Sequence, residues 1–205
     1  MTILIDCGTN FKQGLLEIAS LYPDIKKIYS FEANRYVYDL LDKNDGNVYF
    51  NLAVLDKTGF STFHTEKAIG MLQGKVMHGE DRFIGGGSRL QDPRYACKSN
   101  FDNSDELEKF VDDMYDEIIV PTIRLVDFIN FLNLEDNSII LKLDVEGAEY
   151  KILKDMEKSN IFNKIKKLHV EFHDQFRDPE YDDNRYWINY FNEKQIDYVA
   201  TGMMV

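Results

Sequence analysis

The sequence predicts an α/β protein with a mostly parallel central sheet flanked by helices. Strand and helix patterns alternate up to residue 60, which is typical of parallel strands joined by right-handed crossovers. The same alternation returns near residue 117 and continues to residue 201. Polar residues follow several predicted strands, at the place where open α/β sheets bind ligands. The 205 residues suffice for one domain, and 44% hydrophobic residues can supply its core.

In the first part of the chain, short apolar runs alternate with stretches of helical periodicity. Runs this short favour buried strands over helices. The third run is followed by the turn signal "DKTG" and the alternating run "FSTFHT", which together predict an added β-hairpin. The predicted strands are residues 2–7, 27–33 and 48–55, and the predicted helices are residues 15–21, which end before Pro23, and 36–43.

Residues 66–116 interrupt this alternation. They contain many glycines and little periodicity, apart from an acidic, capped surface helix predicted at residues 103–117. Simple connections of this length are uncommon, so we expect an irregular insertion that acts as a lid or binds substrate, with disorder as the alternative. We expect the glycines around residues 85–89 to be mobile until ligands bind.

The regular pattern then resumes without internal repeats. We therefore treat residues 1–205 as a single domain that carries the irregular segment as an insertion. The remaining predicted strands are residues 117–125, 138–145, 167–174 and 197–201, and the remaining predicted helices are residues 126–132, 147–156 and 184–194.

The charge of the chain limits its partners. A net charge of -12 and a pI near 4.8 disfavour binding to nucleic acids and to anionic membranes, whereas a neutral or cationic small molecule is compatible. We found neither a signal peptide nor an apolar run of about 18 residues, so we expect no membrane span. The expected location is the cytoplasm, or a host cytoplasm for a viral source. Cys7 lies within an apolar run and is expected to pack as a small hydrophobic residue.

The turn after the first strand distinguishes between cofactor classes. A dinucleotide fold needs Gly-x-Gly-x-x-Gly, but the corresponding residues here are Gly8, Asn10 and Gln13. The Asn10 amide instead suits the carboxylate and ammonium of an amino acid, which favours S-adenosylmethionine over NAD. Glu32 ends the second predicted strand about two dozen residues after Gly8, where an acid can bind ribose hydroxyls. The alternative is a solvated acid near a helix N-terminus.

A second informative stretch is "LKLDVEGAEYKIL", residues 141–153. It places Lys142, Asp144, Glu146 and Glu149 around a strand-to-helix turn at Gly147. A turn needs the glycine but not this density of carboxylates beside a buried strand. The alternative is that some of these acids cap the next helix or pair with Lys142.

Four stretches resemble the FkbM-type S-adenosylmethionine-dependent methyltransferases: "IDCGTN", "FEAN", where FEPN is usual, "NLAV" and "LKLDVEGAEYKIL". The resemblance spans roughly residues 3–175 and is loose over residues 66–116. It implies a Rossmann-like class I methyltransferase fold and O-methylation of a hydroxyl, often on a sugar, a glycan or a natural product. Two departures are Lys12, where the family has a glycine, and the few residues after "DYVAT", which leave little room for the usual final strand pair.

The resemblance also implies residue roles by position. The methionine portion would lie at Asp6 to Asn10, the ribose at Glu32, the adenine near Leu52 and Ala53, and the sulfonium and acceptor at Asp144. The similarity of "GGGSRL" to a loop of the family makes Ser88 and Arg89 candidates for substrate binding. The expected cofactor-binding residues are Asp6, Gly8, Thr9, Asn10, Gln13, Glu32, Ala33, Leu52, Ala53 and Asp144.

Methyl transfer to a sugar hydroxyl requires alignment and a base that removes the proton. The candidate catalytic residues are Asp144, Glu146, Glu171 and His173. We prefer His173 as the base, because imidazole titrates near neutral pH, with a surface histidine as the alternative. These residues could instead hold a divalent metal, but their spacing matches no strong metal motif, so we expect none.

Two other functions stay open. An NAD-dependent nucleotide-sugar oxidoreductase is disfavoured by the missing glycines at positions 10 and 13. A catalytically degenerate module that uses the cofactor fold to bind a partner is suggested by Lys12 and the short C-terminal segment. The acceptor and the oligomeric state do not follow from the sequence.

Overall fold

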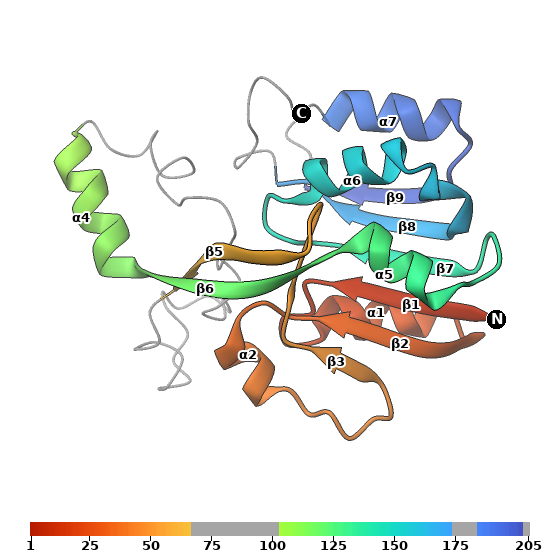
Figure 1. Cartoon of the computed structure of the whole chain (residues 1–205), viewed down its shortest axis with the longest axis horizontal. Coiled ribbons are helices and arrows are strands. Elements are labelled where there is room, and N and C mark those ends of the chain that lie inside the picture. The colour runs from red at the N-terminus through yellow and green to blue at the C-terminus, as the bar shows by residue number, and fades with distance from the viewer. Residues whose placement is uncertain (67–102, 174–183, 203–205) are drawn as a thin grey trace.

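A six-stranded sheet forms the centre of the computed structural model, which describes residues 1–66, 103–173 and 184–202 (Figure 1). The strand order is β3-β2-β1-β7-β8-β9, and every neighbouring pair is parallel, which confirms the predicted α/β class. The order reverses between β1 and β7, where sheets of this kind bind ligands beyond the carboxyl ends of the strands. The strands are β1 (Thr2–Cys7), β2 (Ile25–Phe31), β3 (Val48–Phe50), β7 (Ile139–Leu143), β8 (Ile165–Glu171) and β9 (Tyr198–Thr201).

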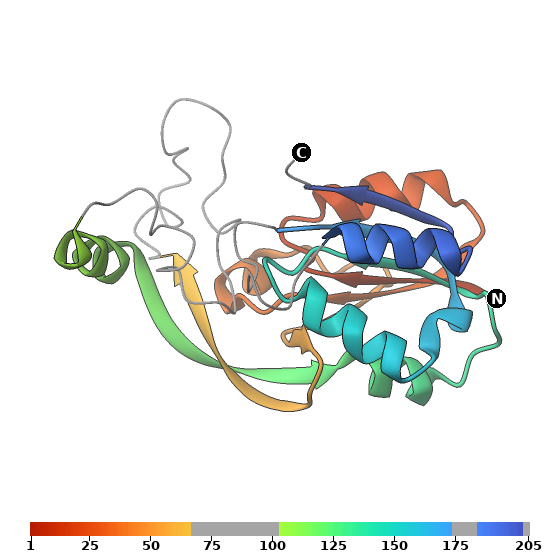
Figure 2. The same ribbon diagram turned by 90° about the horizontal axis from the view of Figure 1, so that it is seen from above.

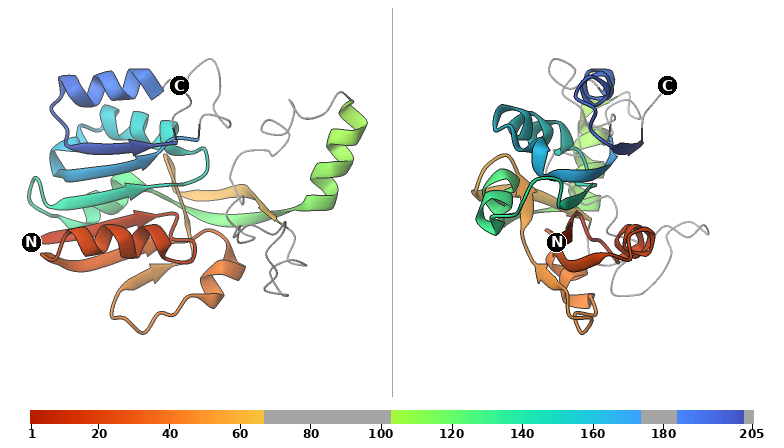
Figure 3. Two further views of the ribbon diagram at one scale, coloured as in Figure 1. Left: turned by 180° about the vertical axis from the view of Figure 1, so that it is seen from behind. Right: turned by 90° about the vertical axis from the view of Figure 1, so that its right-hand side faces the viewer.

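Helices cover both faces of this sheet. Helix α1 (Gln13–Leu21) lies on one face, and α5 (Leu125–Leu132) and α6 (Glu149–Lys158) lie on the other (Figure 3). Helix α7 (Asn184–Glu193) contributes buried side chains to the same core as α6. Two short helices, α2 (Arg35–Leu40) and the 3-10 turn η2 (Ile161–Lys164), follow β2 and α6 respectively. No helix in the described part of the chain has the length and apolarity needed to cross a bilayer.

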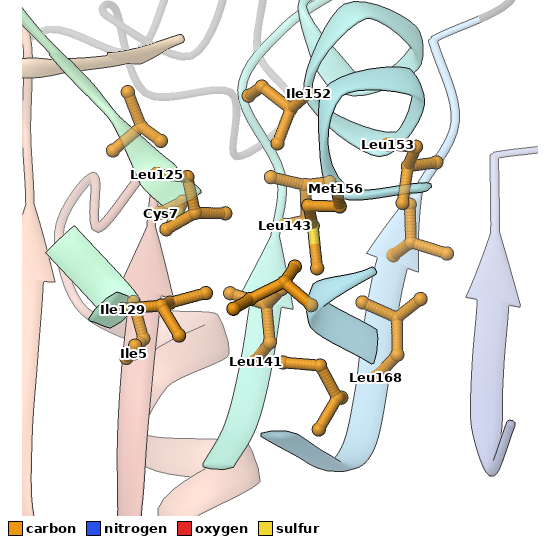
Figure 4. Packing of buried hydrophobic residues seen from close by; sticks show 14 of the residues in the cluster. Ile5, Cys7, Leu125, Ile129, Leu141, Leu143, Ile152, Leu153, Met156 and Leu168 are labelled. Atoms are coloured by element: carbon orange, nitrogen blue, oxygen red, sulfur yellow. The ribbon is translucent and has the colours of Figure 1, made fainter. Parts of the chain in front are cut away.

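Alternation along β1 divides the core between the two faces. Ile3, Ile5 and Cys7 join the large cluster formed with α5 and α6 (Figure 4), whereas Leu4 packs against Leu15 of α1. Cys7 is fully buried among apolar side chains, which confirms that it packs as a small hydrophobic residue.

The predicted third strand, residues 48–55, was wrong as a single element. Strand β3 belongs to the central sheet, but β4 (Ala53–Leu55) belongs to a separate three-stranded sheet. Between them, the side-chain amide of Asn51 donates hydrogen bonds to the backbone oxygens of Glu32 and Ala33, at 2.8 and 3.2 Å. These bonds hold Asn51 at the end of β2, and the chain leaves the central sheet there.

The predicted local hairpin was also wrong. Strand β5 (Gly59–Glu66) pairs antiparallel with β6 (Tyr115–Arg124), and β6 lies between β4 and β5 in the second sheet. The β5–β6 ribbon reaches away from the central sheet to α4 (Ser104–Met114), on the side to which the carboxyl ends of the central strands point (Figures 1 and 2). The acidic helix is confirmed, with the Asn103 side chain as its cap, but it ends where β6 begins at Tyr115.

Candidate functional site

The loop after β1 is held tightly between β2 and β7. The backbone amides of Gly8 and Thr9 both donate to the Phe31 oxygen at 3.0 Å. Gly8 has a φ of 83°, and a Cβ on it would lie 1.7 Å from the backbone oxygen of Asp144. Any larger residue at this position would force the loop after β1 away from the end of β7 at Asp144.

Glu32 lies at the adjacent strand end and is 8% exposed. Its two carboxylate oxygens accept hydrogen bonds from the backbone amides of Asn10 and Asn34, each at 2.8 Å. Burial raises the pKa of Glu32 to about 7, although the two backbone donors act in the opposite direction. Each oxygen keeps a further lone pair, so the carboxylate can still accept from ribose hydroxyls.

A buried lysine connects the two halves of the site. Lys142 Nζ donates to the Gly8 oxygen at 2.8 Å and to Asp144 Oδ2 at 3.0 Å, and lies 3.3 Å from Asp6 Oδ1. Burial lowers the pKa of Lys142, but Asp6 and Asp144 outweigh it and the net shift is upward, so the ammonium stays charged. The close approach of α1 depends on Gly14, since a Cβ there would meet Lys142 Cε at 2.8 Å.

Some buried acceptors here suit an amino-acid ligand. Within the described residues, Asp6 Oδ2 and Asn10 Oδ1 receive no hydrogen bond, and Asp6 Oδ1 faces the Lys142 ammonium at 3.3 Å. Such buried acceptors are costly unless a partner supplies donors. The ammonium of the methionine portion of S-adenosylmethionine would supply them, so the residues present fit this cofactor.

The remaining predicted cofactor residues are less closely grouped. Gln13 begins α1 and is exposed. Leu52 packs against the main core, whereas Ala53 lies in a small cluster with Phe63 that Ala33 also contacts. The adenine role of Leu52 and Ala53 stays a prediction. The candidate substrate residues Ser88 and Arg89 lie outside the described residues.

The four candidate catalytic residues meet around the imidazole of His173, just beyond β8. Its Nε2 atom lies 3.6 Å from Glu146 Oε2, 3.8 Å from Asp144 Oδ1 and 4.0 Å from Glu171 Oε1. Asp144 also belongs to the cofactor side of the site, through Lys142. Asp144 thus joins Lys142 and the Gly8 loop to the residues around His173.

A model of the FkbM methyltransferase domain matches residues 6–198. The chain belongs to the FkbM methyltransferase family. A crystal structure of methyltransferase FkbM from Methylobacillus flagellatus KT is 13% identical, with a TM-score of 0.48, and the match covers 96% of this chain and 37% of that one. The chain thus spans well under half the length of that protein. A search of curated proteins gave no match.

The contact of Glu149 with His173 is a feature of this FkbM-family site that the sequence analysis did not predict. Glu149 is fully buried as the first residue of α6, and its Oε1 atom lies 2.8 Å from His173 Nδ1. The same carboxylate accepts from the backbone amides of Val145 and Gly147, each at 3.0 Å. Glu149 therefore closes the β7–α6 turn and orients His173. The signal in the sequence was an acid just after the turn glycine and a histidine at the end of the next strand.

The environment of His173 changes its expected role. Burial lowers its pKa, but the hydrogen bond with Glu149 and the charges of Glu149, Glu146 and Asp144 outweigh burial and raise it to about 9. An imidazole that already carries two protons at neutral pH cannot accept another. His173 acts as a base only after Nε2 has lost its proton, a requirement that the sequence did not indicate.

Proposed function

We propose that this FkbM-family chain transfers a methyl group from S-adenosylmethionine to a hydroxyl oxygen of a sugar or glycan. The observation that carries the proposal is the position of Asp144. Its Oδ2 atom is tied through Lys142 to the Gly8 loop, and its Oδ1 atom faces His173. The methyl donor and the acceptor would therefore meet at this residue.

The cofactor side of the proposal follows from the hydrogen-bonding capacity of each group. Asp6 and Asn10 would accept hydrogen bonds from the ammonium of the methionine portion. Glu32 would accept from the ribose hydroxyls, with its carboxylate already oriented by Asn10 and Asn34. Leu52 and Ala53 would supply apolar contacts to the adenine.

The acceptor side would lie at Asp144, Glu146, Glu171 and His173. When bound, the cofactor supplies a methyl group on a positively charged sulfur. A carboxylate of this group would accept the proton of the acceptor hydroxyl, whose oxygen would take up the methyl group. Alignment of the oxygen behind the methyl group contributes several kcal/mol. Carboxylates can also accept hydrogen bonds from neighbouring hydroxyls of a sugar ring.

Calorimetry with S-adenosylmethionine, S-adenosylhomocysteine and NAD tests the cofactor. We expect the first two to bind and NAD to fail, because Asn10 and Gln13 replace the glycines that approach a pyrophosphate. Glu32→Ala should weaken the binding of S-adenosylmethionine and of S-adenosylhomocysteine by about 1.5–3 kcal/mol, as expected for lost charge-assisted hydrogen bonds. Glu17→Ala, an exposed acid on α1, is the matched control.

Binding of NAD instead of S-adenosylmethionine would favour the oxidoreductase. Normal binding by Glu32→Ala would remove the ribose role. Transfer of a labelled methyl group to a panel of sugars then tests the reaction itself. Cofactor binding with no transfer to any hydroxyl would favour the catalytically degenerate binding module.

A further inference from the structure

Three side chains of the acceptor side present ligand atoms to one point between β7 and β8. One atom each from Asp144, Glu146 and His173 lies within 4.8 Å of the other two. The imidazole is 7% exposed, whereas the two carboxylates are partly open to solvent. We propose that these three residues bind a divalent cation with mixed nitrogen and oxygen preference, such as Mn²⁺.

Two of the three distances between the ligand atoms suit a shared ion, and the third pair lies within 4.8 Å. Two atoms that both lie about 2.1 Å from an ion are at most about 4.2 Å apart. The Nε2 atom of His173 is 3.8 Å from Asp144 Oδ1 and 3.6 Å from Glu146 Oε2, so both pairs meet this limit as they stand. These separations exceed those of good hydrogen bonds and leave space for an ion between the atoms.

The surroundings hold the ligands in the orientation that binding needs. The contact of Nδ1 with the buried Glu149 carboxylate turns Nε2 toward Asp144 and Glu146. Histidine ligands of metals commonly have a carboxylate on the second ring nitrogen, which fixes the tautomer and strengthens the ligand. Glu146 has a φ of 54°, a left-handed conformation that is rare for this residue type and is consistent with a turn shaped for a specific purpose.

The local charges are also compatible. The ammonium of Lys142 lies 3.0 Å from Asp144 Oδ2, but Asp6 lies 3.3 Å from the same ammonium and balances it. Asp144 Oδ1, Glu146 Oε2 and Glu171 Oε1 then add negative charge within 4.0 Å of His173 Nε2. Imidazole with two carboxylates suits Mn²⁺ and other first-row ions better than Ca²⁺, which prefers oxygen ligands alone.

Three protein ligands leave coordination positions open, as in catalytic rather than structural metal sites. A cation here would contact the acceptor hydroxyl and make its proton easier to remove. This role rests on the proposed function, whereas binding of the ion does not. It would also explain why an imidazole with a carboxylate partner lies among three further acids.

The test uses the whole chain, freed of metal with a chelator and then dialysed, without cofactor or acceptor. Mn²⁺ alone is titrated in, and the electron paramagnetic resonance signal of the free ion is followed. We expect one saturable site per chain and a nitrogen coupling from His173 in the bound spectrum. His173→Gln should abolish the coupling and weaken binding at least 10-fold, and Glu146→Gln, which changes a partly exposed turn residue, should weaken it similarly.

Glu149→Gln should weaken Mn²⁺ binding about 10–100-fold while leaving the three ligands in place. Glu106→Gln removes one exposed acid on α4, remote from the site, and should bind as the wild type does. Circular dichroism of each variant shows whether it is folded. If His173→Gln does not fold, Glu146→Gln is the variant that tests the cation site.

Absence of saturable binding, or equal binding by wild type, His173→Gln and Glu146→Gln, would overturn the cation site. The cofactor calorimetry separates this failure from that of the proposed function. If the chain binds S-adenosylmethionine but not Mn²⁺, the proposed function stands and the cation site is overturned. If the chain binds Mn²⁺ through His173 but does not bind S-adenosylmethionine, the cation site stands and the proposed function is overturned.

Discussion

At the scale of single residues, the sequence indicated positions better than environments. Glu32 could be located as an acid at a strand end, because the second strand and the turn after the first strand were readable. The burial of Glu32 could not be predicted, because it depends on two different loops that bring the backbone amides of Asn10 and Asn34 to the carboxylate. The pairing of Glu149 with His173 was missed for the same reason, since 24 residues separate the partners along the chain.

The buried carboxylate of Glu32 should make wild-type stability depend on pH. Its pKa is about 7 in the folded protein but about 4.3 in an unfolded chain, so the folded state binds more protons between these values. Stability that is present below pH 4.3 is therefore lost as the pH rises through 7, by roughly 4 kcal/mol at most. Glu32→Gln cannot ionise and should lack this loss.

Urea denaturation of both proteins from pH 4.5 to 8 measures the effect. The free energy of unfolding of Glu32→Gln, relative to wild type, should rise across this range, and the exposed control Glu17→Gln should show no such trend. Parallel curves for wild type and Glu32→Gln would mean that Glu32 is not buried in solution. A rise together with weaker cofactor binding would show that the residue serves binding at the expense of stability.

At the scale of elements, period and length predicted where strands lie but not which strands pair. Residues 48–55 read as one strand because the side chains of Asn51 and Leu52 do not break the pattern, yet the Asn51 amide ends the pairing with β2. The alternation of β5 was read correctly as a strand. Its partner β6 begins at residue 115, so no local turn signal could reveal the pairing.

Lys12 shows how an element tolerates a departure from its family. It precedes α1 with a φ of 68°, the left-handed conformation that glycine adopts easily. Its ammonium lies 2.9 Å from Asp45 Oδ2 and 4.6 Å from the centre of the Tyr49 ring. The turn thus keeps a backbone suited to glycine, and the side chain contacts the segment between α2 and β3.

Two glycines with similar backbone angles separate conformational strain from close packing. Gly8 and Gly46 have φ values of 83° and 79°, but a Cβ would meet the Asp144 oxygen at 1.7 Å at the first and nothing within 4 Å at the second. Gly46→Ala should cost about 1 kcal/mol, from strain alone. Gly8→Ala should cost about 3–5 kcal/mol, because β1 and β7 must move apart.

Chemical denaturation compares the two alanine variants. If both variants lose the same free energy of unfolding, the loop after β1 does not approach the end of β7 as the structure shows. If Gly8→Ala folds, its affinity for S-adenosylmethionine should also fall, whereas that of Gly46→Ala should not change.

At the scale of the whole molecule, alternating strands and helices were enough to predict the parallel sheet, and the polar strand ends were enough to predict which candidate residues converge. A parallel sheet places all its carboxyl ends at one edge, so residues far apart in sequence, such as Asp6, Glu32 and Asp144, had to converge. The second sheet could not be predicted from the sequence. Its strands combine one parallel and one antiparallel pairing, and a long insertion separates β4 and β5 from β6.

This convergence predicts that cofactor binding stabilises the entire fold. A ligand that binds only the folded chain adds about 2.7 kcal/mol at a concentration 100 times its Kd. For a chain of this length, that corresponds to a rise in Tm of roughly 5–10 °C. Differential scanning fluorimetry should show this rise with S-adenosylmethionine and none with NAD at the same concentration. Glu32→Ala should show less than about half of it, because a tenfold weaker Kd halves the added free energy. Glu106→Gln should show all of it, and a full shift in Glu32→Ala would place the ribose elsewhere.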